Sequence, residues 1–97
     1  MGTNYYLHVN VCSHCNKPDE IMHPGKKSFG WAFSIRGYNR YDISLLIAAK
    51  FEIDCIQSWR SWKRILKGMP KEWVIKDEYS RIISKNRFII QVEEAII

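Results

Sequence analysis

The chain has 97 residues, the size of one domain, and so small a domain buries a smaller share of its surface than a larger one. Apolar residues make up 46% of it and include four Trp, five Tyr and four Phe, a composition that excludes a disordered chain. The absence of any apolar run of about eighteen residues argues against a membrane span. Because the N-terminus also lacks a basic segment followed by an apolar one, we expect no signal peptide and a cytoplasmic location.

The first half of the chain predicts two strands and a helix. Residues 4–11 are rich in Tyr and Val and alternate in polarity, which predicts a strand. Residues 16–27 contain two prolines and a glycine and predict a loop. Residues 29–35 place aromatic and aliphatic side chains at period two, which is typical of a strand with one buried face. After a turn signal, Asp42 can cap a helix.

The second half predicts a better marked helix and a short strand. Asp54 and Gln57 resemble a capping box, although Ser or Thr is preferred at the first position. Gly68 and the proline two residues later stop this helix. Residues 73–75 then predict a strand.

The C-terminal segment begins with Ser84, a residue type that caps helices, although residues 88–90 would also suit a strand. Together these elements predict a single α+β domain over residues 1–97. We expect a short antiparallel sheet, built from the N-terminal, Trp31 and Trp73 segments, with two or three helices on one face.

A metal site is predicted near the N-terminus. Cysteines with two residues between them can turn both thiolates toward one ion, and tetrahedral zinc then needs two more ligands. His8 precedes the Cys12 and Cys15 pair and His23 follows it, which completes a Cys2His2 set, whereas His14 should point away. The sequence therefore predicts a closed, structural zinc site that staples the N-terminal turn, and three cysteines in all fit a reducing compartment.

Two other interpretations of the cysteine pair stay open. The spacing differs from that of zinc fingers, so the pair can also be two thiols without a metal. A redox pair is the other alternative, although a thioredoxin-like motif belongs at a strand-to-helix junction, which residues 16–27 do not supply.

The formal net charge of +5 is unevenly distributed, since residues 57–71 hold five cations and no acid. Such a stripe can neutralise the phosphates of a nucleic acid, although an acidic host protein would suit it equally and many basic helix faces are only solvated. Trp59 and Trp62, on the apolar side of the same helix, are interpreted as core residues. The predicted partner-binding residues are Lys26, Lys27, Arg60, Lys63, Arg64, Lys67 and Lys71.

Two motifs that suggest enzymes have simpler interpretations. The Gly-Lys-x-Ser segment at residues 25–28 lacks both the earlier glycine and the following helix of a phosphate-binding loop. Asp77 and Glu78 could help a metal-dependent nuclease, but adjacent residues point apart, so we expect Asp77 to serve a turn and Glu78 to pair with Arg81. Cys55 is interpreted as a small core residue. No catalytic residue is assigned.

Several segments together resemble small uncharacterised proteins encoded by bacteriophages. The matching segments are Met1-Gly2-Thr3-Asn4-Tyr5-Tyr6, Cys12-x2-Cys15, His23-x-Gly25-Lys26-x-Ser28-x-Gly30-Trp31-x-Phe33, Trp59-x2-Trp62 and Asp77-Glu78-Tyr79-x-Arg81. Two positions differ from that family, which commonly has Ile after the histidine and Ser after the first lysine, where this chain has Pro24 and Lys27. A further histidine often occurs in the family near the position of Arg36 in this chain. The resemblance implies a phage protein but no established activity.

The sequence therefore predicts a phage accessory protein that binds RNA or DNA through its basic helix and the Lys26-Lys27 segment. The alternative is an inhibitor or modulator of a host protein, for example a defence or transcription factor, and the third hypothesis is a metal-dependent nuclease. No membrane partner is expected.

Overall fold

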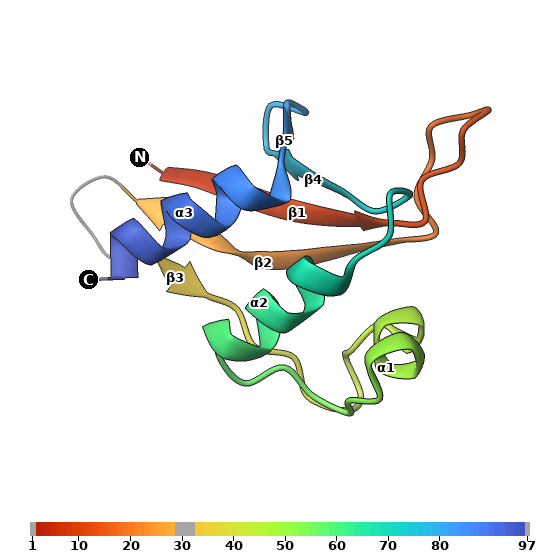
Figure 1. Cartoon of the computed structure of the whole chain (residues 1–97), viewed down its shortest axis with the longest axis horizontal. Coiled ribbons are helices and arrows are strands. Elements are labelled where there is room, and N and C mark those ends of the chain that lie inside the picture. The colour runs from red at the N-terminus through yellow and green to blue at the C-terminus, as the bar shows by residue number, and fades with distance from the viewer. Residues whose placement is uncertain (1, 29–32, 97) are drawn as a thin grey trace.

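The computed structural model describes residues 2–28 and 33–96 and shows an antiparallel five-stranded sheet with three helices (Figure 1). Strand order across the sheet is β3-β2-β1-β4-β5. The strands are β1 (Gly2–Val9), β2 (Glu20–Ser28), β3 (Ser34–Ile35), β4 (Val74–Asp77) and β5 (Ile82–Ile83). The helices are α1 (Leu45–Phe51), α2 (Trp59–Gly68) and α3 (Lys85–Ile96). The predicted α+β class is confirmed.

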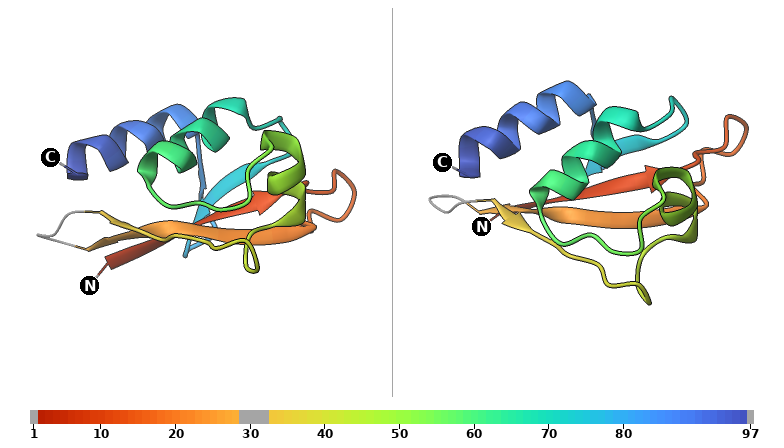
Figure 2. Two further views of the ribbon diagram at one scale, coloured as in Figure 1. Left: turned by 90° about the horizontal axis from the view of Figure 1, so that it is seen from below. Right: turned by 60° about the horizontal axis from the view of Figure 1, so that its bottom comes forward.

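The two faces of the sheet differ. Figure 2 shows α2 and α3 on the same side of the sheet, which we call the helix face. Tyr5, Leu7 and Val9 alternate along β1 and are buried against these helices. Tyr6 and His8 point to the opposite side, here called the open face, which no helix covers in the described part of the chain.

The core fills the space between the helix face and the helices. Its fully buried members include Leu7 and Ile75 from the sheet, Trp62 from α2 and Phe88 from α3. Replacing a buried aromatic of this kind with Ala typically costs about 3–5 kcal/mol. The indole Nε1 of Trp62 donates to the Arg36 carbonyl oxygen at 2.7 Å, so the polar atom of this ring is satisfied inside the core.

The loop prediction for residues 16–27 is wrong from Glu20 onward, because β2 begins there. β2 accommodates Pro24 at an irregularity, since Tyr5 pairs with Gly25 and Leu7 with Met22, leaving two β2 residues opposite Tyr6. At Gly25 the ring of Phe33 lies so close that an added Cβ would be 2.4 Å from Phe33 Cε1. Pro24 and Gly25, whose residue types commonly form turns, therefore lie within a strand here.

The first two helices, α1 and α2, begin later than the sequence predicts. Ser44, rather than Asp42, caps α1, and its Oγ accepts a hydrogen bond from the Ile47 N–H at 3.4 Å. Ser58 is the N-cap of α2, so Cys55 precedes this helix instead of lying on its apolar face. The end of α2 at Gly68 is as predicted.

The C-terminal elements follow the prediction with one addition. β4 extends the predicted strand of residues 73–75, and β5 is a short strand that the sequence pattern did not predict. Ser84 accepts a hydrogen bond from the Arg87 N–H at 3.3 Å at the start of α3, and residues 88–90 are helical. Residues 29–32 of the predicted 29–35 strand lie outside the described residues, and β3 forms its end.

Among the described residues, no helix has the length and apolar character needed to cross a membrane.

Candidate nucleic-acid interfaces

The first basic surface is the exposed side of α2, which we call the helix flank. Its cations are Arg60, Lys63, Arg64, Lys67 and, beyond the end of the helix, Lys71. The helix buries Trp62, Ile65 and Leu66, which leaves this flank to solvent. Four of the five predicted cations are exposed, and Lys63 is half-buried.

One cation of the helix flank is already paired. Lys63 Nζ lies 2.7 Å from Glu93 Oε2 of α3. The Trp59 indole donates to the same oxygen at 3.4 Å. Hydrogen bonds from Lys63 and then from Trp59 lower the pKa of the Glu93 carboxyl, which keeps it ionised. Lys63 is therefore less available to a phosphate than its exposed neighbours.

The tryptophans of α2 support the fold, as predicted. Trp62 is fully buried, and the ring of Trp59 packs against Phe88 with centroids 6.2 Å apart. The only aromatic ring that α2 leaves partly exposed is that of Trp59, and its contacts with Phe88 and Glu93 hold it against α3.

Lys26 and Lys27 lie in β2 and not in a loop. Lys26 pairs with Asn4, whose neighbour Tyr5 faces the helices, so Lys26 lies on the open face. Lys27 pairs with Thr3 and has the opposite orientation. The sheet thus separates Lys26 from the helix flank, and the single basic surface that the sequence predicts is divided in two.

The open face carries a stacked pair of rings at its centre. The rings of Tyr6 and His23 have centroids 5.1 Å apart and an interplanar angle of 24°. Tyr6 comes from β1, and His23 from the irregular part of β2. Both residues are half-buried, and the Nε2 atom of the His23 ring is buried without a hydrogen-bond partner among the described residues, so Tyr6 is the better candidate for contact with a ligand. A flat ring pair on a sheet is a surface on which a nucleic-acid base can stack.

Cations surround this ring pair. Lys76 of β4 pairs with Tyr6 in the sheet register, and Lys26 lies on the other side of β1, opposite Asn4. Arg36, after β3, is close enough to His23 to lower its pKa by charge repulsion. The open face therefore combines positive charge with a half-buried pair of stacked rings.

The two histidines of this face are held in the neutral form. Burial is the larger cause of the lowered pKa of His23, and the Arg36 charge adds to it. For His8, burial again comes first and the Lys76 charge second. Because both pKa values lie below the ordinary value for histidine, both rings are uncharged at neutral pH.

The cysteine pair lies in the connection between β1 and β2. The Asn16 N–H donates to the Cys12 carbonyl oxygen at 2.9 Å, and Asn16 has a φ of 60°, which closes a tight turn. Hydrogen bonds from the backbone of Cys15, then of His14, and from the Cys15 side chain lower the pKa of the Cys12 thiol. A thiol with a lowered pKa is a better metal ligand.

The predicted histidine ligands lie elsewhere. His8 is within β1, and His23 lies three residues into β2, roughly 10 Å along the strand from its start. Within residues 2–28 and 33–96, no group of three or more His, Cys, Asp or Glu side chains gathers in a way that could hold a metal ion. The two thiols supply half of a tetrahedral shell, and the zinc site stays a prediction.

Asp77 and Glu78 have structural roles, but the predicted partner of Arg81 is wrong. Asp77 Oδ2 accepts from Arg81 Nε at 2.7 Å, and Asp77 Oδ1 accepts from the N–H groups of Tyr79 and Arg81. Glu78 instead accepts the Asn4 N–H at 3.0 Å. Asp77, and not Glu78, pairs with Arg81 because the buried Asp77 carboxylate lies inside the turn, where the N–H groups of Tyr79 and Arg81 and the Arg81 side chain all point toward it. Asp77 thus serves the turn, as predicted.

The sequence reasoning missed Tyr6, Lys76 and Arg36. Tyr6 could have been found from the alternation of β1, because a strand that buries Tyr5 must present Tyr6 on the other side. Lys76 and Arg36 become neighbours of the rings only through pairing of distant segments.

Comparison with known proteins adds no assignment to this geometry. No protein-family model, no curated protein and no solved structure matches the chain.

Proposed function

We propose that the protein works by binding single-stranded nucleic acid on the open face. The observation that supports this proposal is the Tyr6–His23 ring pair with Lys26, Lys76 and Arg36 around it. Stacking on aromatic rings requires unpaired bases, because the faces of paired bases are covered by their neighbours in a duplex.

The spacing of the lysines suits one stacked base and its flanking phosphates. Lys26 and Lys76 lie on either side of β1, and their β1 partners Asn4 and Tyr6 are two residues apart. The strand spacings place their backbones about 7 Å apart along β1 and about 10 Å apart across it. Long lysine side chains can therefore contact phosphates on both sides of a base that stacks on Tyr6.

The helix flank is proposed as a second contact for the same polymer. Its exposed cations can neutralise phosphates of any strand, single or double, because charge alone does not distinguish them. It lies on the side of the sheet opposite the ring pair, so the two surfaces can be tested separately.

The test compares a labelled single strand with the duplex of the same sequence, for RNA and for DNA, by fluorescence anisotropy over a range of salt concentrations. We expect the single strand to bind more tightly, and Tyr6→Ala to remove this preference while duplex binding is kept. Equal binding of single strand and duplex by the unchanged protein would exclude the proposal.

A second candidate function is binding to a host protein. The observation that favours it is the exposure of Tyr41, at 81%, and Leu45, at 79%, near the start of α1. Exposed apolar side chains of this kind are common in protein interfaces. A partner retained from a host lysate after nuclease treatment, and lost in the Tyr41→Ser, Leu45→Ser variant, would favour this function.

Zinc bound by Cys12 and Cys15 is a separate proposal that rests on the turn and on the lowered pKa of Cys12. A bound ion would link the two thiolates and stabilise the connection between β1 and β2. Elemental analysis of the purified protein tests it, because stoichiometric zinc should disappear in Cys12→Ser and Cys15→Ser. Absence of zinc from the folded, unchanged protein would refute it.

A further inference from the structure

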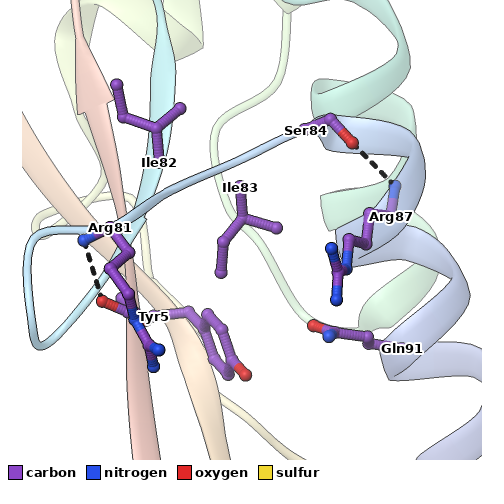
Figure 3. A pocket seen from close by; sticks show the side chains of 8 residues that line it. Tyr5, Arg81, Ile82, Ile83, Ser84, Arg87 and Gln91 are labelled. Atoms are coloured by element: carbon purple, nitrogen blue, oxygen red, sulfur yellow. Dashed lines mark hydrogen bonds and ion pairs between the residues drawn. The ribbon is translucent and has the colours of Figure 1, made fainter.

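A pocket of about 460 Å³ lies between the β4–β5 end of the sheet and the start of α3, on the helix face (Figure 3). This pocket is separate from both basic surfaces described above. Its lining comes from β1, the β4–β5 turn, β5 and α3. The residues that line it are Tyr5, Asp77, Arg81, Ile82, Ile83, Ser84, Arg87 and Gln91.

Two arginines enter the pocket from different elements. Arg81 follows the β4–β5 turn and Arg87 is in the first turn of α3, and Figure 3 shows them on opposite sides of Tyr5. Arg81 is positioned by its bond to Asp77 at 2.7 Å. Arg87, in contrast, forms no ion pair with any of the described residues. The pocket therefore has a net positive charge and suits an anion.

The start of α3 adds to this preference. The first turn contains Lys85 and Arg87 and no acidic residue. Cations are unfavourable at the positive end of a helix dipole, where an anion is favourable. A negatively charged ligand beside Arg87 would remove this mismatch and would also lie near the Ser84 hydroxyl.

The pocket, at about 460 Å³, is larger than a simple anion needs, and its lining is mixed in polarity. Ile83 and the ring of Tyr5 add apolar surface on the helix face, whereas the Ile82 side chain points to the open face, since Ile82 pairs with Lys76. Gln91 Oε1 is buried and has no hydrogen-bond partner among the described residues. An unpartnered buried acceptor marks a place where a ligand donor is favourable. The ligand should therefore carry an apolar or aromatic body and an N–H or O–H group as well as its negative charge.

Tyr5 provides a hydrogen-bond donor beside the arginines. Burial, and then the charge of Asp77, raise the pKa of the Tyr5 hydroxyl above its ordinary value. The hydroxyl thus stays protonated at neutral pH and can donate to an anionic oxygen.

We propose that this pocket binds a phosphorylated nucleoside, with the phosphate between Arg81, Arg87 and Ser84 and the nucleoside against Ile83 and Gln91. Guanidinium groups pair with phosphate oxygens, and the base or sugar supplies both the flat body and the donor for Gln91. Free mononucleotides and the phosphorylated end of a nucleic-acid strand share this chemistry.

The first arm of the test uses calorimetry on the full chain with each of the four ribonucleoside 5′-monophosphates, the four unphosphorylated nucleosides and inorganic phosphate. At least one monophosphate should bind, and its nucleoside and inorganic phosphate should bind about tenfold more weakly or worse. The second arm compares a short single strand carrying a 5′-phosphate with the same strand carrying a 5′-hydroxyl. A preference in the first arm alone identifies free nucleotides as the ligand, and a preference in the second identifies strand ends.

The variants assign any binding to the pocket. Arg87→Gln should weaken it about tenfold, because one charge-assisted contact is lost. Arg40→Gln, which changes an exposed arginine outside the pocket and outside both basic surfaces, is the matched control and should have no effect. Since Arg87 is exposed, its variant should keep the unfolding temperature of the unchanged protein.

The proposal is overturned if no monophosphate or phosphorylated end binds better than its unphosphorylated counterpart, if inorganic phosphate binds as tightly as the monophosphates, or if folded Arg87→Gln binds like the unchanged protein. Tyr6→Ala separates this pocket from the function proposed above. It should reduce strand binding on the open face and leave monophosphate binding unchanged.

Discussion

The open face and the helix flank are both basic, but they offer different chemistry to a nucleic acid. On the helix flank, Trp62 is buried in the core, the half-buried Trp59 packs against Phe88, and one lysine is held by Glu93. On the open face, the half-buried Tyr6 stacks on His23 among cations, and no helix covers this side of the sheet in the described residues. Charge without rings favours any phosphate backbone, whereas charge with rings favours unpaired bases. The distribution of aromatic side chains, more than that of lysines, therefore distinguishes the two surfaces.

The largest expected effect is that of Tyr6→Ala on single-strand affinity. Loss of one stacking ring should weaken binding by about 1–3 kcal/mol, and Tyr6→Phe should retain most of it. Fluorescence anisotropy with a labelled single strand measures the change. Tyr41→Ala is the matched control, because that tyrosine is 81% exposed and away from the ring pair. An equal loss in both variants would contradict the assignment to the open face.

The second effect concerns the lysines of the open face. Lys26→Gln with Lys76→Gln should lower the salt dependence of single-strand binding, each by about 0.7 in the slope of log affinity against log salt. Titrations at several salt concentrations give this slope. If it is unchanged, these lysines do not contact phosphates and only the rings support the open face.

The cations of the helix flank should affect the affinity for nucleic acid but not the preference for a single strand. Arg60→Gln, Arg64→Gln and Lys67→Gln together should weaken single-strand and duplex binding to the same extent, because these side chains contribute charge alone. The ratio of the two affinities is the measurement. A selective loss of single-strand binding would transfer the proposed function to α2.

The smallest effect is a pH dependence of stability that arises from the open face. The pKa values of His8 and His23 are lowered in the folded protein, so the unfolded chain takes up these protons first as the pH falls. Stability should therefore be complete above about pH 6.5 and should decrease below it, toward the folded-state pKa values.

Thermal unfolding between pH 7.5 and 5.5 measures this decrease. The His8→Gln, His23→Gln variant should flatten the profile in this range, whereas Lys63→Gln on the helix flank should not. An unchanged profile in the histidine variant would show that neither group is responsible. The lowered pKa values of Asp77 and Glu93 act at lower pH, below their ordinary values, and do not overlap with this range.

Local patterns predicted those features that depend on neighbours in the chain. The alternation of Tyr5, Leu7 and Val9 identified β1, and Gly68 and Ser84 marked a helix end and a helix start. The same reasoning failed at β2, where Pro24 and Gly25 predict a loop. Pairing with β1 and the cover of Phe33 make a strand favourable there, and neither contact is visible locally.

For the candidate surfaces too, local spacing predicted some features, and others depend on contacts between distant segments. The spacing of Arg60, Arg64 and Lys67 was sufficient to predict the helix flank, because helical periodicity places them together. Lys26 was recognised as a basic residue, but its place beside Tyr6 and opposite the helices depends on sheet register. The pairing of Asp77, and not Glu78, with Arg81 likewise depends on which side chain the turn directs inward.

The α+β class, the apolar core side chains and the positive charge could all be predicted from composition and periodicity, because these are properties of short segments. Tertiary structure alone decided that Tyr6 and His23 stack, that Lys76 lies beside them, and that Arg81 and Arg87 enter one pocket. These contacts join residues far apart in the chain, and the antiparallel pairing of β1 with β2 and β4 brings them together.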